Sequence, residues 1–207
     1  MGRGHKRTGH RILTVGTDVS VGKMYTSLAL VEALSARGYK THFRATGQTG
    51  IFIAGGGIAV DAVVSDFISG AVEWLSPDLP ADEWDVIEGQ GSLYHAAFAG
   101  VTLGLLHGAQ PDYYVVCHDA SRKTMRGTPT IPVPSIADVI SATESAGRLT
   151  NPAICCMGIA VNTSSLAESE ALQLLDRMGE EYQLPCVDPV RQGAEALVDY
   201  LDKLRAS

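Results

Sequence analysis

Residues 16–23, Gly-Thr-Asp-Val-Ser-Val-Gly-Lys, combine glycines and a lysine in the spacing of a loop that binds phosphate. Glycine permits a tight turn in which successive backbone N–H groups point inward, and the start of a following helix adds positive potential. The Lys23 ammonium can then reach the outer phosphates of a ligand. The alternative is an ordinary strand-turn-helix junction. The residues predicted to hold the ligand are Gly16, Thr17, Asp18, Ser20, Val21, Gly22, Lys23, Met24 and Tyr25.

Two features of this loop depart from the common phosphate-loop pattern. The loop has one residue more between Gly16 and Gly22 than the usual consensus. The residue after Lys23 is Met24, where the pattern has a serine or threonine whose hydroxyl binds Mg²⁺. A thioether is a soft ligand and does not replace a hard oxygen ligand for Mg²⁺. The loop is therefore expected to bind phosphate, while hydrolysis of a magnesium nucleotide is not favoured, and no resident metal is predicted.

A carboxylate ends the apolar run at residues 84–88, Trp-Asp-Val-Ile-Glu, and Gly89, Gln90 and Gly91 follow it. From the end of such a strand an acid reaches a nucleotide-bound metal or its water. Glu88 is thus the metal-associated residue if the ligand is a magnesium nucleotide. Its alternative role is to cap the next helix. Gly91 is expected to let the backbone approach the ligand.

Several polar residues follow other predicted strands. Asn162 ends an apolar run, and its amide has both a donor and an acceptor, as reading an adenine edge requires; a turn-capping role is equally open. Gln48 and Thr49, together with Gln90, are placed for contact with a substrate. Arg122 belongs to a basic cluster in a long loop, which either closes over an anion or is simply solvated.

These residues must be positioned by strands that alternate with helices. Apolar runs predict strands over residues 11–15, 41–45, 84–88, 113–117, 154–161 and 186–187. Helical periodicity predicts helices over residues 23–37, 61–75, 135–148, 166–182 and 193–204. Asp61 is explained as the N-cap of its helix, Ser135 as the N-cap of another, and residues 120–134 read as a loop.

This alternation predicts an α/β fold with three layers, in which a mostly parallel sheet is covered by helices on both faces. In such sheets the ligand lies at the carboxyl ends of the strands. The loops that follow the strands are therefore expected to carry the site. The sequence predicts one domain over residues 11–207, preceded by a basic extension or linker remnant at residues 1–10.

Composition and charge limit the possible partners. The formal net charge is −7, which is poorly suited to non-specific contact with a nucleic-acid backbone. The four cysteines have no metal-ligand spacing and do not form a disulfide framework in a chain of this length. Residues 89–111 carry no formal charge, but polar residues and glycines interrupt them, so a core segment is favoured over a membrane span. We expect a soluble cytoplasmic protein with a small-molecule substrate and no nucleic-acid or membrane partner.

Long segments resemble one family. They are GTDVSVGKMYTSLAL (16–30), ATGQTGIFIAGGGIAVDAVVSDFISGAVE (45–73), EGQGSLYHAAFAGVTLGLLHGAQPD (88–112), LTNP (149–152), VNTS (161–164) and DPVRQGA (188–194). Together they are similar to the C-terminal P-loop domain of the D-glutamate N-acetyltransferase-like family, within the wider dethiobiotin-synthetase-like class of P-loop proteins. The family usually carries methionine after the loop lysine, so Met24 agrees with it. The resemblance also implies an N-terminal Rossmann-like domain in the parent protein.

The resemblance implies transfer of acetyl from acetyl-CoA to the amino group of D-glutamate or a similar amino acid. Coenzyme A presents an adenine and phosphates that a phosphate loop can hold without hydrolysing them. The transfer needs a base for the substrate ammonium and a donor for the thioester oxygen. His95, Glu88 and Asp18 are candidates for the base, and Lys23 or a backbone N–H is the candidate donor.

Two other functions stay open on the sequence. The first is an ATP-dependent ligase or kinase of the dethiobiotin-synthetase type with Mg²⁺, which Glu88 and the loop spacing favour and Met24 opposes. The second is a non-catalytic module that binds a nucleotide. A homo-oligomer is compatible with either function.

Overall fold

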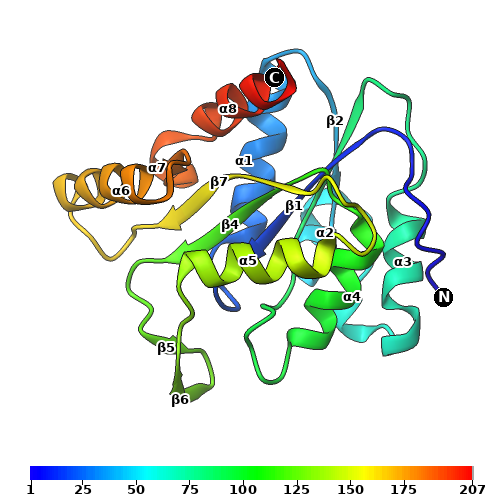
Figure 1. Cartoon of the computed structure of the whole chain (residues 1–207), viewed down its shortest axis with the longest axis horizontal. Helices are drawn as coiled ribbons and strands as arrows, with labels where there is room; N and C mark the ends of the chain where they lie inside the picture. Colours follow the sequence, from blue (N-terminus) through cyan, green and yellow to red (C-terminus); the bar gives the residue numbers. More distant parts are fainter. Residues whose placement is uncertain (207) are drawn as a thin grey trace.

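The computed structural model describes residues 1–206 and contains a six-stranded, fully parallel sheet in the order β2-β3-β1-β4-β7-β8 (Figure 1). Strand β1 lies in the middle and pairs with β3 and β4, with Leu13 opposite both Ile87 and Tyr114. A two-stranded antiparallel hairpin, β5 and β6, stands apart from this sheet. The carboxyl ends of β1, β3, β4 and β7 all lead toward one edge of the sheet, because the strands are parallel.

The strands of the main sheet are β1 His10–Gly16, β2 Lys40–Arg44, β3 Glu83–Ile87, β4 Tyr113–Asp119, β7 Cys155–Asn162 and β8 Cys186–Val187, and those of the hairpin are β5 Thr124–Met125 and β6 Thr128–Pro132. The helices are α1 Lys23–Ala36, α2 Gln48–Ala54, α3 Ile68–Leu75, α4 Ala99–Ala109, α5 Ile136–Gly147, α6 Glu168–Tyr182, α7 Pro189–Gln192 and α8 Glu195–Ala206. Two 3-10 turns precede α3, η1 Val60–Ala62 and η2 Ser65–Phe67.

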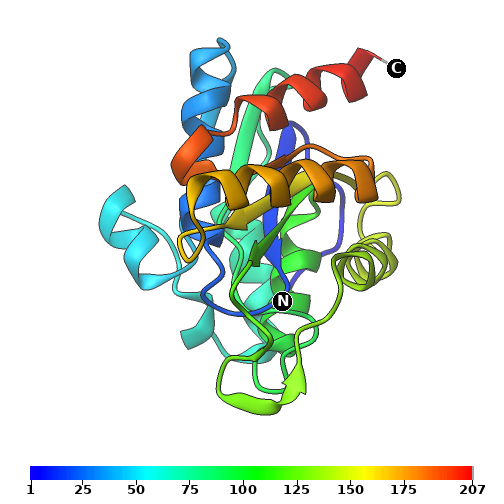
Figure 2. The same cartoon turned by 90° about the vertical axis from the view of Figure 1, so that its left-hand side faces the viewer.

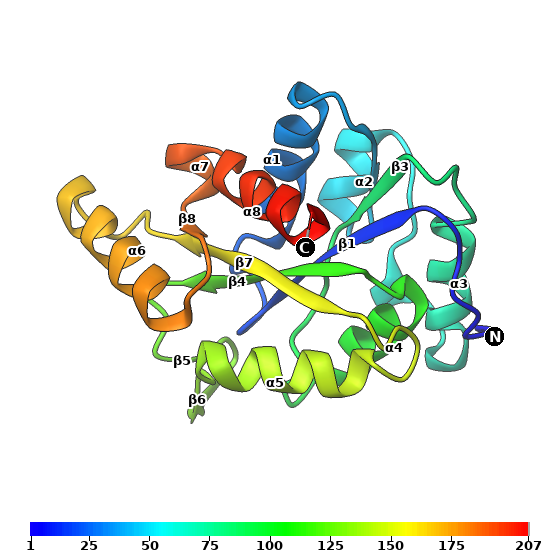
Figure 3. The same cartoon turned by 45° about the horizontal axis from the view of Figure 1, so that its top comes forward.

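Two apolar cores hold the layers together, one on each face of the sheet. Alternate residues of one strand point to opposite faces, so Ile12 belongs to one core and Leu13 to the other. The first face carries α1 and α8, which contribute Leu34 and Leu201. The second face carries α3, α4, α5 and α6, and Figure 3 shows α8 and α5 on opposite sides of the sheet. The predicted three-layer α/β fold is confirmed.

The strand predictions hold to within a few residues, and Ser135 caps α5 as predicted, with Asp138 completing a capping box. The segment before α3 differs. The predicted helix over residues 61–75 begins only at Ile68, and Asp61 lies in the turn η1 and caps no helix. The short helix α2 is not among the predicted helices, and it ends at Gly55, whose left-handed conformation suits glycine.

Two further segments have more structure than the sequence predicted. Residues 120–134, predicted as a loop, contain the hairpin β5–β6, which projects at the end of the molecule away from α8 (Figure 2). The uncharged segment 89–111 contains α4, whose Leu105 and Leu106 are buried in the core. Within residues 1–206 no helix has both the length and the apolar character needed to cross a bilayer. All four cysteines are free thiols.

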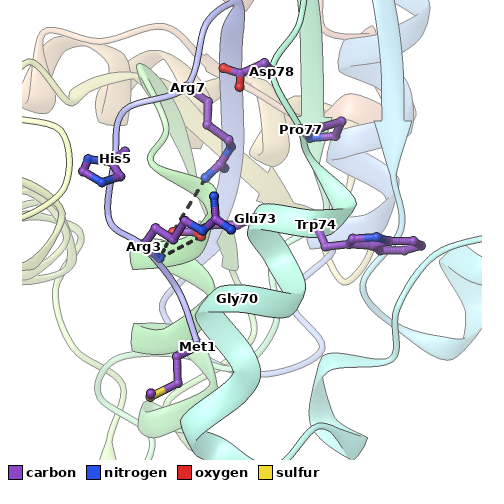
Figure 4. Close-up of a pocket in the computed structure, with 9 residues that line it drawn as sticks. All are labelled: Met1, Arg3, His5, Arg7, Gly70, Glu73, Trp74, Pro77 and Asp78. Carbon is purple, nitrogen blue, oxygen red and sulfur yellow. Dashed lines mark hydrogen bonds and ion pairs between the residues drawn. The ribbon is translucent and has the colours of Figure 1, made fainter.

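The basic N-terminal residues 1–10 lie against α3 and α4. The Arg7 guanidinium donates to the carbonyls of Gly108 (2.6 Å) and Ala109 (3.4 Å) at the end of α4, and burial lowers its pKa to about 10. Glu73 of α3 accepts the backbone N–H of Arg3 and Gly4, as part of a hollow of about 570 Å³ that exposed Trp74 borders (Figure 4). These contacts tie the extension to the domain.

Candidate functional site

The loop between β1 and α1 has the shape that binds phosphate groups. Ser20 and Gly22 both adopt left-handed backbone conformations, with φ of 55° and 100°. Glycine takes this conformation without strain, and it turns the chain so that α1 begins at Lys23. The amino end of a fourteen-residue helix therefore points into the loop and supplies positive potential there.

The Lys23 side chain lies under this loop and is 6% exposed. Its ammonium donates to the backbone carbonyl of Asp18 at 2.8 Å. Burial lowers the pKa of Lys23 to about 8, and the nearby carboxylates of Asp18 and Glu88 only partly oppose this effect. A phosphate would offer the ammonium a stronger partner than the carbonyl, because charge-assisted hydrogen bonds exceed neutral ones.

A cavity of about 540 Å³ opens beside Lys23, at the carboxyl ends of β1, β2 and β3. We call it the main cavity. Its wall includes the loop, the start of α1, the start of α2 and the residues after β3. Its lining residues are Ser20, Gly22, Lys23, Met24, Tyr25, Gly47, Gln48, Thr49, Asp61, Glu88, Gly89, Gln90 and Asn162.

Glu88 is placed in the main cavity by the loop that follows β2. Its side-chain oxygen Oε2 accepts the backbone N–H groups of Thr46 (2.9 Å) and Gly47 (3.0 Å), and the Thr46 hydroxyl donates to the Glu88 carbonyl (2.5 Å). A side chain at Gly50 would collide with the carboxylate, so glycine there lets α2 approach it. The second oxygen, Oε1, has no hydrogen-bond partner within residues 1–206.

A smaller cavity of about 210 Å³ lies on the other side of Tyr25, and we call it the side cavity. It shares Gly22, Tyr25 and Asn162 with the main cavity, so the two adjoin. The Oδ1 atom of Asn162 accepts the Ser164 N–H at 3.0 Å, which leaves its amide nitrogen as a donor. The remaining lining residues are Val21, Thr26, Ala160, Ser164, Asp188, Pro189 and Val190.

Behind the loop lies a buried polar network that lines neither cavity. The Asp18 carboxylate is fully buried and accepts three hydrogen bonds, from Val19 N, from the Arg122 guanidinium and from Arg126 N, each at 2.7 Å. Both oxygens are thus engaged, and Oδ2 fastens the hairpin segment to the phosphate loop through Arg122 and Arg126. The charge of Arg122 is also shared with Asp119, 3.6 Å away.

Two histidines belong to this network. His95 is 3% exposed, its Nδ1 accepts the Ala97 N–H at 3.2 Å, and its Nε2 lies 2.9 Å from the Arg126 carbonyl. The neutral tautomer with a proton on Nε2 satisfies both contacts, so neither ring nitrogen faces the main cavity. His118 lies 3.0 Å from the Thr17 hydroxyl, and burial lowers its pKa.

The structure divides the residues predicted from sequence into two groups. Ser20, Val21, Gly22, Lys23, Met24, Tyr25, Gln48, Thr49, Glu88, Gln90 and Asn162 line the two cavities. Gly16, Thr17, Asp18, Gly91, His95 and Arg122 line neither. Gly91 has a positive φ of 70° and packs against α4, where a side chain would collide with Thr102, so its glycine serves the packing of α4.

Sequence reasoning missed several lining residues. Asp61 was explained as a helix cap, and Asp188, Pro189 and Val190 stood only in a quoted motif. The residue pair Asp188-Pro189 is a recognisable helix start, because an aspartate cap precedes a proline in the first turn, and the structure shows this cap. Within residues 1–206 no three His, Cys, Asp or Glu side chains gather as a metal site.

The sequence of this chain is similar to a protein family and to two curated proteins. A family model described as "Domain of unknown function (DUF1611_C) P-loop domain" matches residues 1–198. A protein of Pseudoalteromonas sp named D-glutamate N-acetyltransferase is 53% identical over 95% of this chain and 59% of its own length. A protein of Tritonibacter scottomollicae with the same name is 50% identical over 96% of this chain and 60% of its own length. The chain therefore spans about 60% of the length of these relatives.

Solved structures agree with the fold. A DUF1611 family protein from Anabaena variabilis, 39% identical, superposes with a TM-score of 0.89 over 95% of this chain and 58% of its own. Cobyrinic acid a,c-diamide synthase from Mycobacterium smegmatis with bound ADP and magnesium has a TM-score of 0.55 at 14% identity, covering 96% of this chain and 94% of that one. At that identity the second likeness supports the P-loop NTPase-like fold alone.

Proposed function

This chain belongs to the DUF1611 family as its P-loop domain, and we propose that it holds coenzyme A for an enzyme that moves acetyl from acetyl-CoA to the amino group of D-glutamate or a similar amino acid. The names of the two curated relatives support the reaction class. The phosphate loop and the two adjoining cavities support a phosphate-bearing carrier next to a second substrate.

The observation that carries the proposal is the pairing of Lys23 with Met24 at the floor of the main cavity. Lys23 is positioned to bind a phosphate, while the methionine offers no hydroxyl to a magnesium ion. Such a loop suits a ligand that is held and not hydrolysed. The adjoining side cavity, with the donor nitrogen of Asn162, is where an adenine would lie.

In the transfer, the amino nitrogen of the acceptor attacks the carbonyl carbon of the thioester. An N–C bond forms, the C–S bond breaks with its electron pair passing to sulfur, and the departing thiolate takes up a proton. The acceptor ammonium must lose a proton before it can attack. We assign this step to Glu88, because it lines the main cavity and its Oε1 has no hydrogen-bond partner within residues 1–206, whereas Asp18 and His95 are engaged in the buried network.

The hydrogen bonds and polar groups around Glu88 suit it to act as the base. Its Oε2 is held by two backbone N–H groups, so the carboxylate is fixed without using Oε1. The donor for the developing oxyanion is Lys23 or a backbone N–H of the loop. Gln48, Thr49 and Gln90 supply neutral polar groups for the acceptor in the same cavity.

Calorimetric titration tests the proposal directly. We expect coenzyme A and acetyl-CoA to bind and to protect the chain against thermal unfolding, because a ligand that binds only the folded state stabilises it. Release of free thiol from acetyl-CoA in the presence of D-glutamate would report the transfer. Binding of ATP with Mg²⁺ and no binding of coenzyme A would overturn the proposal.

The second candidate is an ATP-dependent ligase or kinase that uses Mg²⁺. The position of Glu88 after β3 favours it, since this is where a P-loop enzyme keeps a metal-associated acid. For this second function, Glu88 would lie beside the metal. The titration would then show binding of ATP with Mg²⁺ and no binding of coenzyme A.

We also propose that the functional protein contains more than this domain. The curated relatives are longer than this chain, and a further domain, of the Rossmann-like type expected from the family resemblance, would complete the substrate site. A second copy of the chain is an alternative source of the same groups. The proposed partner is a small molecule and neither a nucleic acid nor a membrane, and we expect the protein to act in the cytoplasm.

A further inference from the structure

Asp61 stands on the wall of the main cavity, which it shares with Lys23 and Glu88. It belongs to the turn η1 and its side chain is exposed. Nothing in the sequence pattern marks it, because the local signal is that of a helix cap. The absence of a helix at this position leaves the carboxylate without its expected structural role.

The other two acids that line the cavities, Asp188 and Glu88, accept hydrogen bonds from the backbone, whereas Asp61 does not in the part of the chain that the structure describes. Asp188, in the side cavity, accepts the backbone N–H groups of Thr163, Val190 and Arg191. Glu88 accepts two backbone N–H groups on one oxygen. Asp61 has no hydrogen bond and no ion pair within residues 1–206, so both of its oxygens are open to a ligand.

The backbone around Asp61 is nevertheless fixed. Val60 is fully buried in the core, and its N–H donates to the Thr46 carbonyl at 3.0 Å. Two residues earlier, Ile58 donates to the Ala45 carbonyl at 3.1 Å. The turn is therefore hydrogen-bonded to the same loop after β2 that holds Glu88. A side chain on such an ordered backbone binds a ligand with little loss of conformational entropy.

The charges of the main cavity indicate what Asp61 binds. Lys23 is the cation on its lining and is committed to the phosphate of the carrier, whereas Asp61 and Glu88 are both anionic. A cationic group of the second substrate would be attracted to these carboxylates. We infer that Asp61 binds the ammonium group of the amino-acid acceptor and presents it to Glu88, an inference that rests on the proposed function.

Binding of two acceptors that differ only in the amino group tests this role. D-glutamate and glutarate have the same two carboxylates, and only D-glutamate has an ammonium. In calorimetric titrations with saturating coenzyme A, on the protein that carries the proposed further domain, Asp61→Asn should weaken D-glutamate binding by roughly tenfold, since a charge-assisted contact has been removed. Glutarate binding should stay unchanged or become tighter, because the variant removes a like charge from the cavity. Asp66→Asn is the matched control, because Asp66 occupies the next 3-10 turn, is also exposed and does not line the main cavity.

Each outcome bears on one claim. An equal loss for both ligands, or no loss for D-glutamate, overturns the role of Asp61. A wild-type protein that carries the proposed further domain and binds coenzyme A but not D-glutamate also overturns it and leaves carrier binding by the phosphate loop intact. If coenzyme A does not bind and no thiol is released, the proposed function fails, and the role of Asp61, which rests on it, fails with it.

Discussion

Glu88 and Asp18 are two buried carboxylates next to the same phosphate loop, and they serve different regions of the molecule. Asp18 is fully buried, with both oxygens engaged by the phosphate loop and the hairpin β5–β6. Glu88 is 4% exposed and lines the main cavity; one oxygen holds the loop after β2, and the other has no hydrogen-bond partner within residues 1–206. Two carboxylates of similar burial can therefore differ in how many of their oxygens the fold leaves without a hydrogen-bond partner.

The largest effect is expected from Asp18→Asn. The amide would place N–H hydrogens either against the Val19 N–H or against both the Arg122 guanidinium and the Arg126 N–H, and it would leave Arg122 without its closest anion. We expect a loss of about 3 kcal/mol in the free energy of unfolding, as for a broken buried ion pair. Urea denaturation would measure it, with Asp66→Asn as the control. A loss no larger than that of the control would remove the distinction between the two carboxylates.

Lys23→Ala should have the next largest effect, which we expect on ligand binding. Removal of the ammonium takes away a charge-assisted contact to phosphate, so the binding of coenzyme A should weaken by about 2 kcal/mol. Isothermal titration calorimetry measures the change. Lys203→Ala, in the last turn of α8, is the control, because it removes the same charge at a position away from the site. Equal affinities of wild type and Lys23→Ala would contradict the phosphate-loop assignment.

The pH dependence of Lys23 has opposite signs for binding and for folding. Its pKa in the folded protein is about 8, because of burial, against an ordinary value of 10.5. Affinity for a phosphate ligand should therefore fall as the pH rises above about 8, where the ammonium is lost. The unfolded chain holds this proton more tightly, so the contribution of Lys23 to stability should increase between about pH 8 and 10.5.

Titrations of coenzyme A and urea denaturation across this pH range would reveal both trends. Lys23→Met, which has no titratable group, is the matched control and should flatten both. A wild-type profile that coincides with that of Lys23→Met would show that another group controls the pH dependence.

The smallest change in stability is expected from Glu88→Gln. The amide keeps an oxygen acceptor for the N–H groups of Thr46 and Gly47, so we expect a loss of about 1 kcal/mol, well below that of Asp18→Asn. Acetyl transfer, followed by thiol release, should fall much more than stability does, because the free oxygen loses its basicity. If Glu88→Gln unfolds as easily as Asp18→Asn, the two acids have the same structural role.

Local patterns in the sequence predicted much of this molecule. Alternating apolar runs and helical periods gave the parallel sheet with helices on both faces, and the glycines and Lys23 gave the phosphate loop. Glu88 and Asn162 were placed at the ends of strands for the same reason. These features depend on residues close together in the chain, where steric limits on the backbone and side-chain periodicity act directly.

Local sequence patterns could not predict that Asp18, His95 and Arg122 lie outside the two cavities. Asp18 binds Arg126, which is 108 residues away in the sequence, and Glu88 binds Thr46 at a separation of 42. The predicted helix over residues 61–75 begins only at Ile68, so Asp61 lies in the turn η1 and lines the main cavity.

The sequence by itself determined the strands, most of the helices, the sheet type and the phosphate loop. Only the tertiary structure decided which acids are saturated and which face a ligand. The physical reason is that a carboxylate is satisfied by whichever donors the folded chain brings within hydrogen-bond distance, and those donors come from distant segments.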